Sequence, residues 1–261
     1  MSPAEGIGSG ARVPEGLVEA LNRAGRILVL TGAGVSAESG IPTFRQAQSG
    51  LWAKYDPMAL ASPEGFESDP ATVWRWYQWR RELVSRAEPN PGHVALARLQ
   101  EIRPGLVLVT QNVDGLHQAA GAGEVLELHG NLTRSICSRT GRVIDAEWLE
   151  THAESEPPPS PHHARGLARP DVVWFGETLD VDTLEAAFSA ARECQLCLVA
   201  GTAGAVEPAA SLPRVAAASG AAVADINPEA SGISHLADWH LEGTSAEWLP
   251  RLTGVLDRLG N

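Results

Sequence analysis

Short apolar runs separated by helix-like segments constrain the fold of this chain more than any other feature of its sequence. The runs are continuous rather than alternating in polarity, which is typical of strands buried on both faces of a sheet. Strands that alternate with helices predict an α/β fold with a doubly wound, mostly parallel, Rossmann-like sheet, in which ligands bind beyond the carboxyl ends of the strands. We expect strands over 26–31, 106–110, 125–128, 196–201, 221–227 and 239–241, and helices over 15–24, 93–101, 183–194 and 208–219.

Two stretches interrupt this alternation and predict a smaller inserted module over one edge of the sheet. The first is rich in Trp, Arg and Pro and has helical spacing around 70–87, so we expect a helical lid there. The second is polar and contains a proline cluster. The expected division is a Rossmann-like domain of 1–45, 91–131 and 173–261 and a small module of 46–90 and 132–172.

Composition excludes several classes of protein. The 261-residue chain has 32 acidic and 20 basic side chains, and its net charge of −12 argues against binding to nucleic acid or to an anionic membrane surface. Three cysteines are too few for a disulfide scaffold or a four-cysteine zinc site, which indicates a reducing, cytoplasmic location. No apolar stretch has the length of a membrane span or of the core of a secretory leader.

A glycine-rich turn follows the first expected strand. The sequence from Gly32 to Ala37, GAGVSA, fits the G-x-G-x-x-G/A pattern, in which Gly32 permits a tight turn, Gly34 lets the backbone approach a pyrophosphate, and Ala37 lets helix and strand pack closely. The pattern alone is equally compatible with a structural turn. No second strand ending in an acidic residue follows at the usual spacing, which disfavours an ordinary dehydrogenase.

Several motifs in a fixed order give the chain a family resemblance. The segment 32–45, GAGVSAESGIPTFR, resembles the NAD-binding signature of the sirtuins, the NAD-dependent protein deacylases. QNVDGLH at 111–117, ELHGN at 127–131, VVWFGE at 172–177, Gly201-Thr202 and Ile226-Asn227 resemble later blocks of the same family. Ordered motifs over roughly residues 20–250 are far more specific than one glycine turn. The resemblance implies removal of acyl groups from protein lysines with NAD, releasing nicotinamide and O-acyl-ADP-ribose.

The resemblance assigns NAD contacts to several loops. Phe44 would shield the reacting carbon from water, although a core phenylalanine is an alternative. The family usually has Ser where this chain has Ala203, so one hydroxyl contact is absent or moved. The residues expected to contact NAD are Gly32, Ala33, Gly34, Ala37, Thr43, Phe44, Arg45, Gln111, Asn112, Asp114, Gly201, Thr202, Asn227 and Ser245.

His129 is the expected catalytic base. It lies in the matching ELHGN block, and a histidine with a pKa near neutrality can take a proton from a ribose hydroxyl. The resemblance places Asn112 and Asp114 with it in the catalytic set, where they would hold the carboxamide and the ribose or a water. An Asn and an Asp that merely make a turn after a strand are the alternative.

Tyr77 and Arg80 suggest which acyl group is removed. At helical spacing they share a face with Val73 and Val84, where an unpaired arginine is costly, so an internal salt bridge is one explanation. Tyr-x-x-Arg also resembles the pair in sirtuins that remove succinyl, malonyl or glutaryl groups. Arg80 would then bind the acyl carboxylate, with Tyr77 adding a hydrogen bond.

The substrate peptide is expected along VVWFGE. The resemblance implies that Val173, Trp174 and Phe175 form a strand that pairs with an extended acyl-lysine peptide. An ordinary buried strand is the alternative.

The zinc site that is typical of the family is predicted to be lost. Zinc would need two C-x-x-C pairs, but only Cys137 is present, with Thr140 at its partner position and Pro161 and Ala164 near the second pair. Substitution by histidines fits no common spacing. We therefore expect no metal site, and a small module held by apolar contacts that involve Ile144, Trp148 and Leu149.

Two other functions remain open on the same fold. One is an NAD-dependent ADP-ribosyltransferase or NAD hydrolase, and the other is a non-catalytic NAD-binding module. His129, Asn112 and Asp114 argue against the module, and the Tyr77–Arg80 pair favours deacylation over the other NAD reactions.

Overall fold

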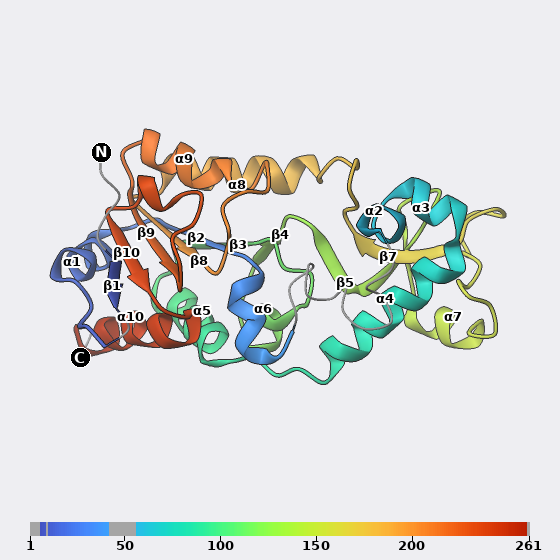
Figure 1. Cartoon of the computed structure of the whole chain (residues 1–261), viewed down its shortest axis with the longest axis horizontal. Helices are drawn as coiled ribbons and strands as arrows, with labels where there is room; N and C mark the ends of the chain where they lie inside the picture. Colours follow the sequence, from blue (N-terminus) through green and yellow to red (C-terminus); the bar gives the residue numbers. More distant parts are fainter. Residues whose placement is uncertain (1–5, 9, 42–55, 260–261) are drawn as a thin grey trace.

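The structure is a computed structural model that describes residues 6–8, 10–41 and 56–259, and it consists of two parts side by side (Figure 1). The larger part is built on a parallel sheet with the strand order β1-β10-β9-β8-β2-β3-β4. This arrangement confirms the predicted doubly wound sheet. Its strands are β1 (Gly6–Gly8), β2 (Ile27–Thr31), β3 (Leu106–Thr110), β4 (Val125–Glu127), β8 (Leu196–Ala200), β9 (Ala222–Asn227) and β10 (Trp239–Glu242).

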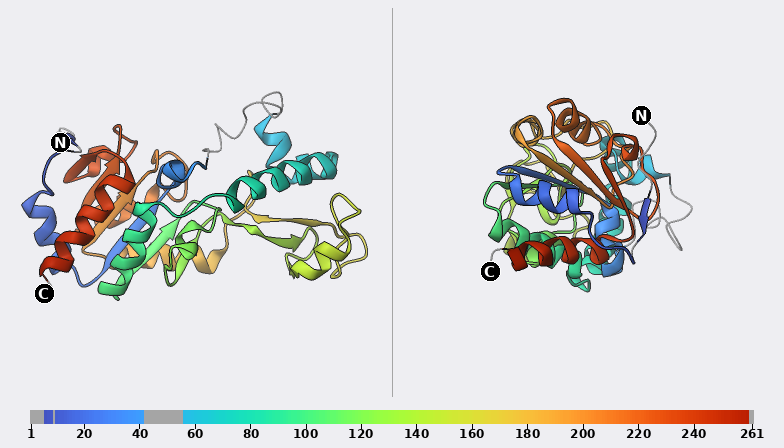
Figure 2. Two further views of the ribbon diagram at one scale, coloured as in Figure 1. Left: turned by 90° about the horizontal axis from the view of Figure 1, so that it is seen from below. Right: turned by 90° about the vertical axis from the view of Figure 1, so that its left-hand side faces the viewer.

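Helices cover both faces of this sheet, which explains why its strands are continuously apolar (Figure 2). One face packs against α1 (Glu15–Arg23), α5 (Pro91–Ile102) and α10 (Ser245–Leu259), with Leu17, Leu96 and Trp248 among the buried side chains. The other face packs against α8 (Val181–Glu193) and α9 (Ser211–Ala218). Two short helices, α6 (Leu116–Ala119) and the 3-10 helix η4 (Ser234–Leu236), lie in loops between strands.

The smaller part combines an antiparallel sheet with short helices. Its strands are β5 (Gly130–Cys137), β6 (Val143–Ile144) and β7 (Ala168–Val172), in the order β6-β5-β7. Its helices are α2 (Pro57–Leu60), α3 (Pro63–Ser68), α4 (Pro70–Ser85) and α7 (Ala146–Thr151). The apolar core of this part includes Trp76, Tyr77 and Trp174, so one face of α4 packs on the strands.

Local sequence explains where α4 begins. The Asp69 side chain accepts a hydrogen bond from the Thr72 N–H at 3.0 Å, and Pro70 occupies the first helical position, where its missing N–H has no consequence. The helix then presents Tyr77 to the core and leaves Arg80 half-buried, as the spacing of the sequence predicts.

None of the helices in the described residues is both long enough and apolar enough to cross a membrane.

Candidate active site

Two glycine-containing loops meet at the topological switch point of the sheet, between β2 and β8. The N–H of Gly34 donates to the Gly201 oxygen at 2.8 Å, and a Cβ on Gly34 would lie only 2.8 Å from the Gly201 Cα. A Cβ on Gly32 would lie 2.7 Å from the Thr202 Cβ. The glycines are therefore required first for the close approach of two protein loops, and these loops form the crevice where a doubly wound fold binds its ligand.

The segment after Gly32 is a 3-10 helix, η1 (Ala33–Ser39). Ala33 and Ala37 are exposed on it. The close packing of Ala37 between helix and strand, which the motif predicts, is therefore absent, because the tighter 3-10 turn directs this side chain to the surface. Thr43, Phe44 and Arg45 lie outside the described residues.

Ser36 is the centre of a buried polar network between η1 and the loop after β3. Its hydroxyl donates to the Asp114 carboxylate at 2.7 Å and accepts from the Asn112 side-chain amide at 3.0 Å. The Nε2 of His93 lies 3.3 Å from the same hydroxyl. The network fixes the two predicted catalytic residues of this loop in one orientation. Sequence reasoning missed Ser36 and His93, because only the fold brings these distant segments together.

A second set of buried polar side chains lies next to the network around Ser36. Thr31 donates to the Thr110 hydroxyl at 2.8 Å, and its own hydroxyl lies 2.9 Å from the Nε2 of His117. Burial, together with the neighbouring His93, lowers the pKa of His117 to about 3. His117 is therefore neutral at physiological pH and holds adjacent strands together.

His129 lies at the carboxyl edge of the sheet, where the chain passes from β4 to β5. Its Nδ1 is 3.0 Å from the backbone oxygen of Gln111. Because a carbonyl only accepts hydrogen bonds, we assign the ring proton to Nδ1, which leaves Nε2 as a free base. Burial lowers the pKa of His129 below its ordinary value, and the bond to Gln111 opposes this shift without cancelling it. The imidazole is thus neutral at pH 7, as a base must be.

The predicted NAD residues of the other loops share the same edge. The Gln111 side-chain amide donates to the Thr202 hydroxyl at 3.0 Å, which ties the loops after β3 and β8 together. Asn227 ends β9, and its amide donates to the buried carboxylate of Asp225. The Ser245 Oγ is buried and, within the described ranges, has no hydrogen-bond partner. An orphaned hydroxyl beside polar loops at the switch point fits a bound polar nucleotide.

Tyr77 and Arg80 lie on α4, in the part of the molecule that faces this edge. The Tyr77 oxygen accepts from the Trp174 Nε1 at 2.9 Å. The Arg80 guanidinium carbon lies 5.0 Å from the centre of the Trp76 ring and 5.5 Å from that of Tyr77. Burial lowers the pKa of Arg80, while Tyr77, through its hydrogen bond and its charge, and more weakly the negative charge of Asp114 act in the opposite direction.

Arg80 has no acidic partner among the described residues, so the structure does not support the salt-bridge explanation. Its neighbour Arg81 differs. Arg81 donates to the backbone oxygens of Leu132 and Arg134, both at 2.7 Å, and to the Ser135 hydroxyl at 2.9 Å. Arg81 thus fastens α4 to β5, whereas the guanidinium of Arg80 contacts the Trp76 and Tyr77 rings and donates a hydrogen bond to the Tyr77 oxygen.

The predicted strand over Val173–Phe175 is wrong. Strand β7 ends at Val172, and the next three N–H groups all donate within the chain. Val173 donates to His129 at 3.0 Å, Phe175 to Ala61 at 2.9 Å, and Trp174 to the Glu177 carboxylate at 2.9 Å. The tertiary bonds to His129 and Ala61 and the local bond to Glu177 override the strand propensity of the apolar run and occupy the N–H donors of this segment.

Cys137 lies in the second apolar cluster of the smaller part, with Trp74, Ile144 and Ala168, and Trp148 and Leu149 pack against it. Burial raises the pKa of the Cys137 thiol, but hydrogen bonds from the Ser160 and Thr140 hydroxyls and nearby backbone amides outweigh it and lower the pKa to about 7. No group of three or more potential ligands for a metal ion occurs in the described part of the chain.

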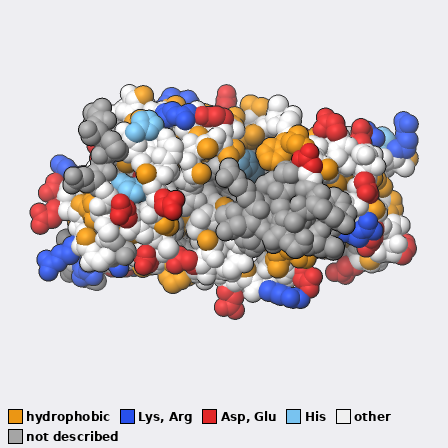
Figure 3. Space-filling model, in the orientation of Figure 1, with side chains coloured by type: hydrophobic (Ala, Val, Ile, Leu, Met, Phe, Trp, Pro, Cys, Tyr) orange, Lys and Arg blue, Asp and Glu red, His pale blue; other side chains and the backbone are white. Residues whose placement is uncertain are grey.

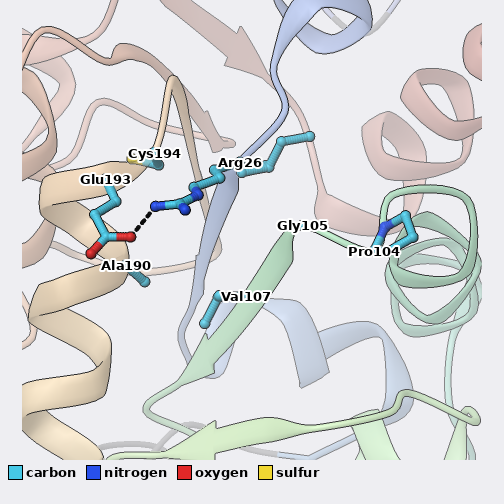
Figure 4. A pocket seen from close by; sticks show the side chains of 8 residues that line it. Arg26, Pro104, Gly105, Val107, Ala190, Glu193 and Cys194 are labelled. Atoms are coloured by element: carbon cyan, nitrogen blue, oxygen red, sulfur yellow. Dashed lines mark hydrogen bonds and ion pairs between the residues drawn. The ribbon is translucent and has the colours of Figure 1, made fainter.

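Two surface features lie apart from this site. On the face drawn in Figure 3, the Lys and Arg side chains are scattered and form no basic patch. A cavity of about 220 Å³ lies at the opposite, amino-terminal edge of the sheet, where Arg26 and Glu193 form an ion pair (Figure 4). The residues lining it are Arg26, Ile27, Pro104, Gly105, Val107, Ala190, Glu193 and Cys194.

A nucleotide-using α/β enzyme is the class of protein that the fold and site define, because a neutral base and an amide–carboxylate pair lie beside the crevice at the switch point. The characteristic sequence pattern of the Sir2 family matches residues 32–208, which is more than half of the 261 residues. The chain therefore belongs to the Sir2 family. The predictions of an NAD-dependent protein deacylase and of NAD as its cofactor are thereby confirmed.

Named relatives and solved structures agree with this family assignment. An NAD-dependent protein deacylase of Aquifex aeolicus is 47% identical over 88% of this chain and 95% of its own. NAD-dependent protein deacylase 1 of Pseudomonas aeruginosa is 48% identical over 90% of this chain and 96% of the relative's own length. A Sir2 homologue in complex with NAD superimposes with a TM-score of 0.86 at 41% identity, over 95% of this chain and 96% of that one. A Sir2–p53 peptide–NAD+ complex superimposes with a TM-score of 0.81 at 31% identity, over 94% of this chain and 98% of that one.

Proposed function

We propose that this enzyme preferentially removes acidic acyl groups, succinyl or malonyl, from protein lysines, and that it also accepts acetyl groups. The observation that carries the proposal is Arg80. It lies half-buried against the Trp76 and Tyr77 rings, donates a hydrogen bond to Tyr77, and has no ion pair with an acidic side chain among the described residues. A guanidinium in such surroundings is stabilised by a carboxylate, and a succinyl or malonyl group supplies one.

His129 is the base in this proposal. Bound NAD supplies the ribose hydroxyl and the electrophilic carbon on which the family's chemistry depends. The Nε2 of His129 takes a proton, and its Nδ1–H bond to Gln111 keeps the ring in the orientation and tautomer that leave Nε2 free. The lowered pKa keeps this nitrogen unprotonated at neutral pH.

Asn112 and Asp114 hold the nicotinamide end of the cofactor. Ser36 bridges them, so one amide and one carboxylate are presented in a fixed arrangement before any ligand arrives. A site that is already ordered does not spend binding energy on ordering itself.

The acyl-lysine peptide passes between the two parts of the molecule, beside Val173, Trp174 and Phe175. Because the three N–H groups of this segment are occupied, the peptide is held by its own N–H donors and by apolar contacts, and the exposed Phe175 ring is one such contact. The peptide complex among the structural neighbours supports a peptide substrate.

We also propose that the small module folds without zinc in a reducing cytoplasm. Cys137, Ser160 and Thr140 form a hydrogen-bonded cluster, and Trp148 donates to the Pro159 oxygen at 2.8 Å. The Ile144, Trp148 and Leu149 side chains complete an apolar cluster. Hydrogen bonds and apolar burial thus supply the cross-links that a metal would otherwise supply. All three cysteines are free and buried.

Mass spectrometry of one succinyl-lysine peptide, incubated with and without NAD, tests the proposed reaction. Loss of succinate only with NAD, together with release of nicotinamide, is the expected result. Nicotinamide release without deacylation would instead indicate an ADP-ribosyltransferase or NAD hydrolase. A matched acetyl-lysine peptide that reacts faster than the succinyl peptide would contradict the acidic preference.

A further inference from the structure

The hydrogen bond between Trp174 and Tyr77 fixes the direction of a proton. An indole N–H can only donate, so the Tyr77 oxygen accepts from the Trp174 Nε1 at 2.9 Å. The hydroxyl hydrogen of Tyr77 must then point to another acceptor. Arg80 also donates a hydrogen bond to the Tyr77 oxygen, and its guanidinium has no acceptor atom for the hydroxyl hydrogen. No acceptor for this hydrogen is found within residues 6–8, 10–41 and 56–259.

Trp174 is itself held from three directions. Arg169 lies over its ring, with the guanidinium carbon 3.4 Å from the ring centre. Glu177 receives two hydrogen bonds from Arg169, at 2.6 and 2.9 Å, and a third from the Trp174 N–H. The Phe66 ring packs 5.3 Å away. Because ring and backbone are both fixed, the indole N–H has one direction only.

We propose that Trp174 is a positioning residue for the acyl group: its indole N–H orients the Tyr77 hydroxyl so that this hydroxyl donates to the carboxylate bound by Arg80. This inference rests on the proposed preference for acidic acyl groups. It concerns a side chain that acts through Tyr77 and not one that touches the reacting atoms. An acetyl group has no carboxylate, so it gains nothing from this arrangement.

A packing role is the competing explanation, since Trp174 is only 3% exposed and belongs to the core of the smaller part. The two roles differ in their consequences. Loss of packing alone would disturb every substrate, whereas loss of the indole donor disturbs only a substrate that uses the Tyr77 hydroxyl. Selectivity between two acyl groups therefore distinguishes them.

The experiment measures kcat and KM for succinyl-lysine and acetyl-lysine forms of one peptide at saturating NAD. In Trp174→Phe we expect KM for the succinyl peptide to rise about three- to tenfold, the effect of one hydrogen bond, with a smaller change for the acetyl peptide. Trp148→Phe is the matched control, because it removes the indole donor to Pro159 in the same module. It should change both substrates in equal proportion.

The double variant Tyr77→Phe/Trp174→Phe tests the connection directly. If Trp174 acts through Tyr77, the double variant has the selectivity of Tyr77→Phe alone. Additive losses, or a Trp174→Phe that lowers both activities equally, would overturn the inference. If Trp174→Phe does not fold, replacing Trp174 by β-(3-benzothienyl)alanine keeps the bicyclic ring, lacks only the N–H, and must give the same shift in selectivity.

Arg80→Met in the same series separates this inference from the proposed function. Equal losses on both peptides in Arg80→Met would refute the acidic preference itself. A selective loss in Arg80→Met, combined with no selective loss in Trp174→Phe, would refute the role of Trp174 and leave the proposed function standing.

Discussion

The large sheet and the small module use polar side chains in opposite ways. At the edge of the large sheet, the network around Ser36 is satisfied within the protein, from Asn112 through Ser36 to Asp114. In the small module, Arg80 has no acidic partner among the described residues, and the hydroxyl hydrogen of Tyr77 has no acceptor there. The first arrangement suits chemistry common to every substrate. The second is completed only by a particular ligand.

The comparison implies a division between two roles: the edge of the large sheet carries out the reaction, and the region around Arg80 recognises the acyl group. Variants at the edge of the large sheet should affect all acyl groups equally, because they act on the reaction. Variants around Arg80 should affect acyl groups unequally, because they act on recognition. The predictions that follow challenge this division, beginning with the largest expected effect.

Replacement of the base should lower activity strongly and to the same extent for every acyl group. We expect His129→Ala to lower kcat by about 10²- to 10⁴-fold on succinyl and acetyl peptides alike, since a positioned base contributes that much. The exposed His235 provides a control, and His235→Ala should leave both rates close to those of the wild type. A large difference between the two peptides in His129→Ala would break the proposed division.

The buried ion pair beneath Trp174 should contribute to stability. Arg169→Met leaves the Glu177 carboxylate without its charged partner, which should lower the free energy of unfolding by about 3 kcal/mol. Urea unfolding of purified protein measures this loss. The exposed Arg142 is the control, and Arg142→Met should change stability by less than about 0.5 kcal/mol. Equal stability of the two variants would show that the pair does not stabilise the module.

The pH dependence should show a base with a lowered pKa. The neutral form of His129 is active and exists above its pKa, so activity falls as pH decreases through that value. Because burial lowers this pKa, the acid limb of kcat should have its midpoint below the ordinary histidine value of 6.5. A midpoint above 6.5, measured on both peptides, would contradict the assigned environment of the base.

The smallest expected effect is that of a zinc chelator, which should leave the protein unchanged. A strong zinc chelator should change neither the thermal unfolding temperature nor the activity, because the cluster around Cys137 is held by hydrogen bonds and apolar contacts. Elemental analysis provides an independent check. Stoichiometric zinc in the purified protein would contradict the proposed metal-free module.

The sequence was sufficient for much of the large sheet. Runs buried on both faces are visible as continuous apolar segments, and the helices between them have clear periodicity. It did not indicate β1, whose three residues include two glycines and form a strand only by pairing with His240–Glu242. It also did not indicate α10, which contains Pro250 and is fixed by packing on α5 and on the sheet.

Site residues that lie in recognisable motifs could be predicted from the sequence. Residues that join the site only because the fold brings distant segments together could not. His129, Asn112 and Asp114 could be named from their blocks, but Ser36 and His93 become partners of these residues only in three dimensions. The segment Val173–Phe175 shows the reverse error. Its composition predicts a strand, and two tertiary hydrogen bonds together with one local bond to Glu177 determine a different backbone.

The ratio of kcat/KM for succinyl over acetyl peptide, compared between wild type and Arg80→Met, tests the central claim most directly. Arg75 lies on the same helix, is exposed, and contacts Glu156 and the Thr72 hydroxyl on the surface, so Arg75→Met is the matched control. We predict that the ratio falls at least about tenfold in Arg80→Met, as removal of a charged hydrogen-bond donor requires, and that it is unchanged in Arg75→Met. Equal losses on both peptides in Arg80→Met would contradict the account.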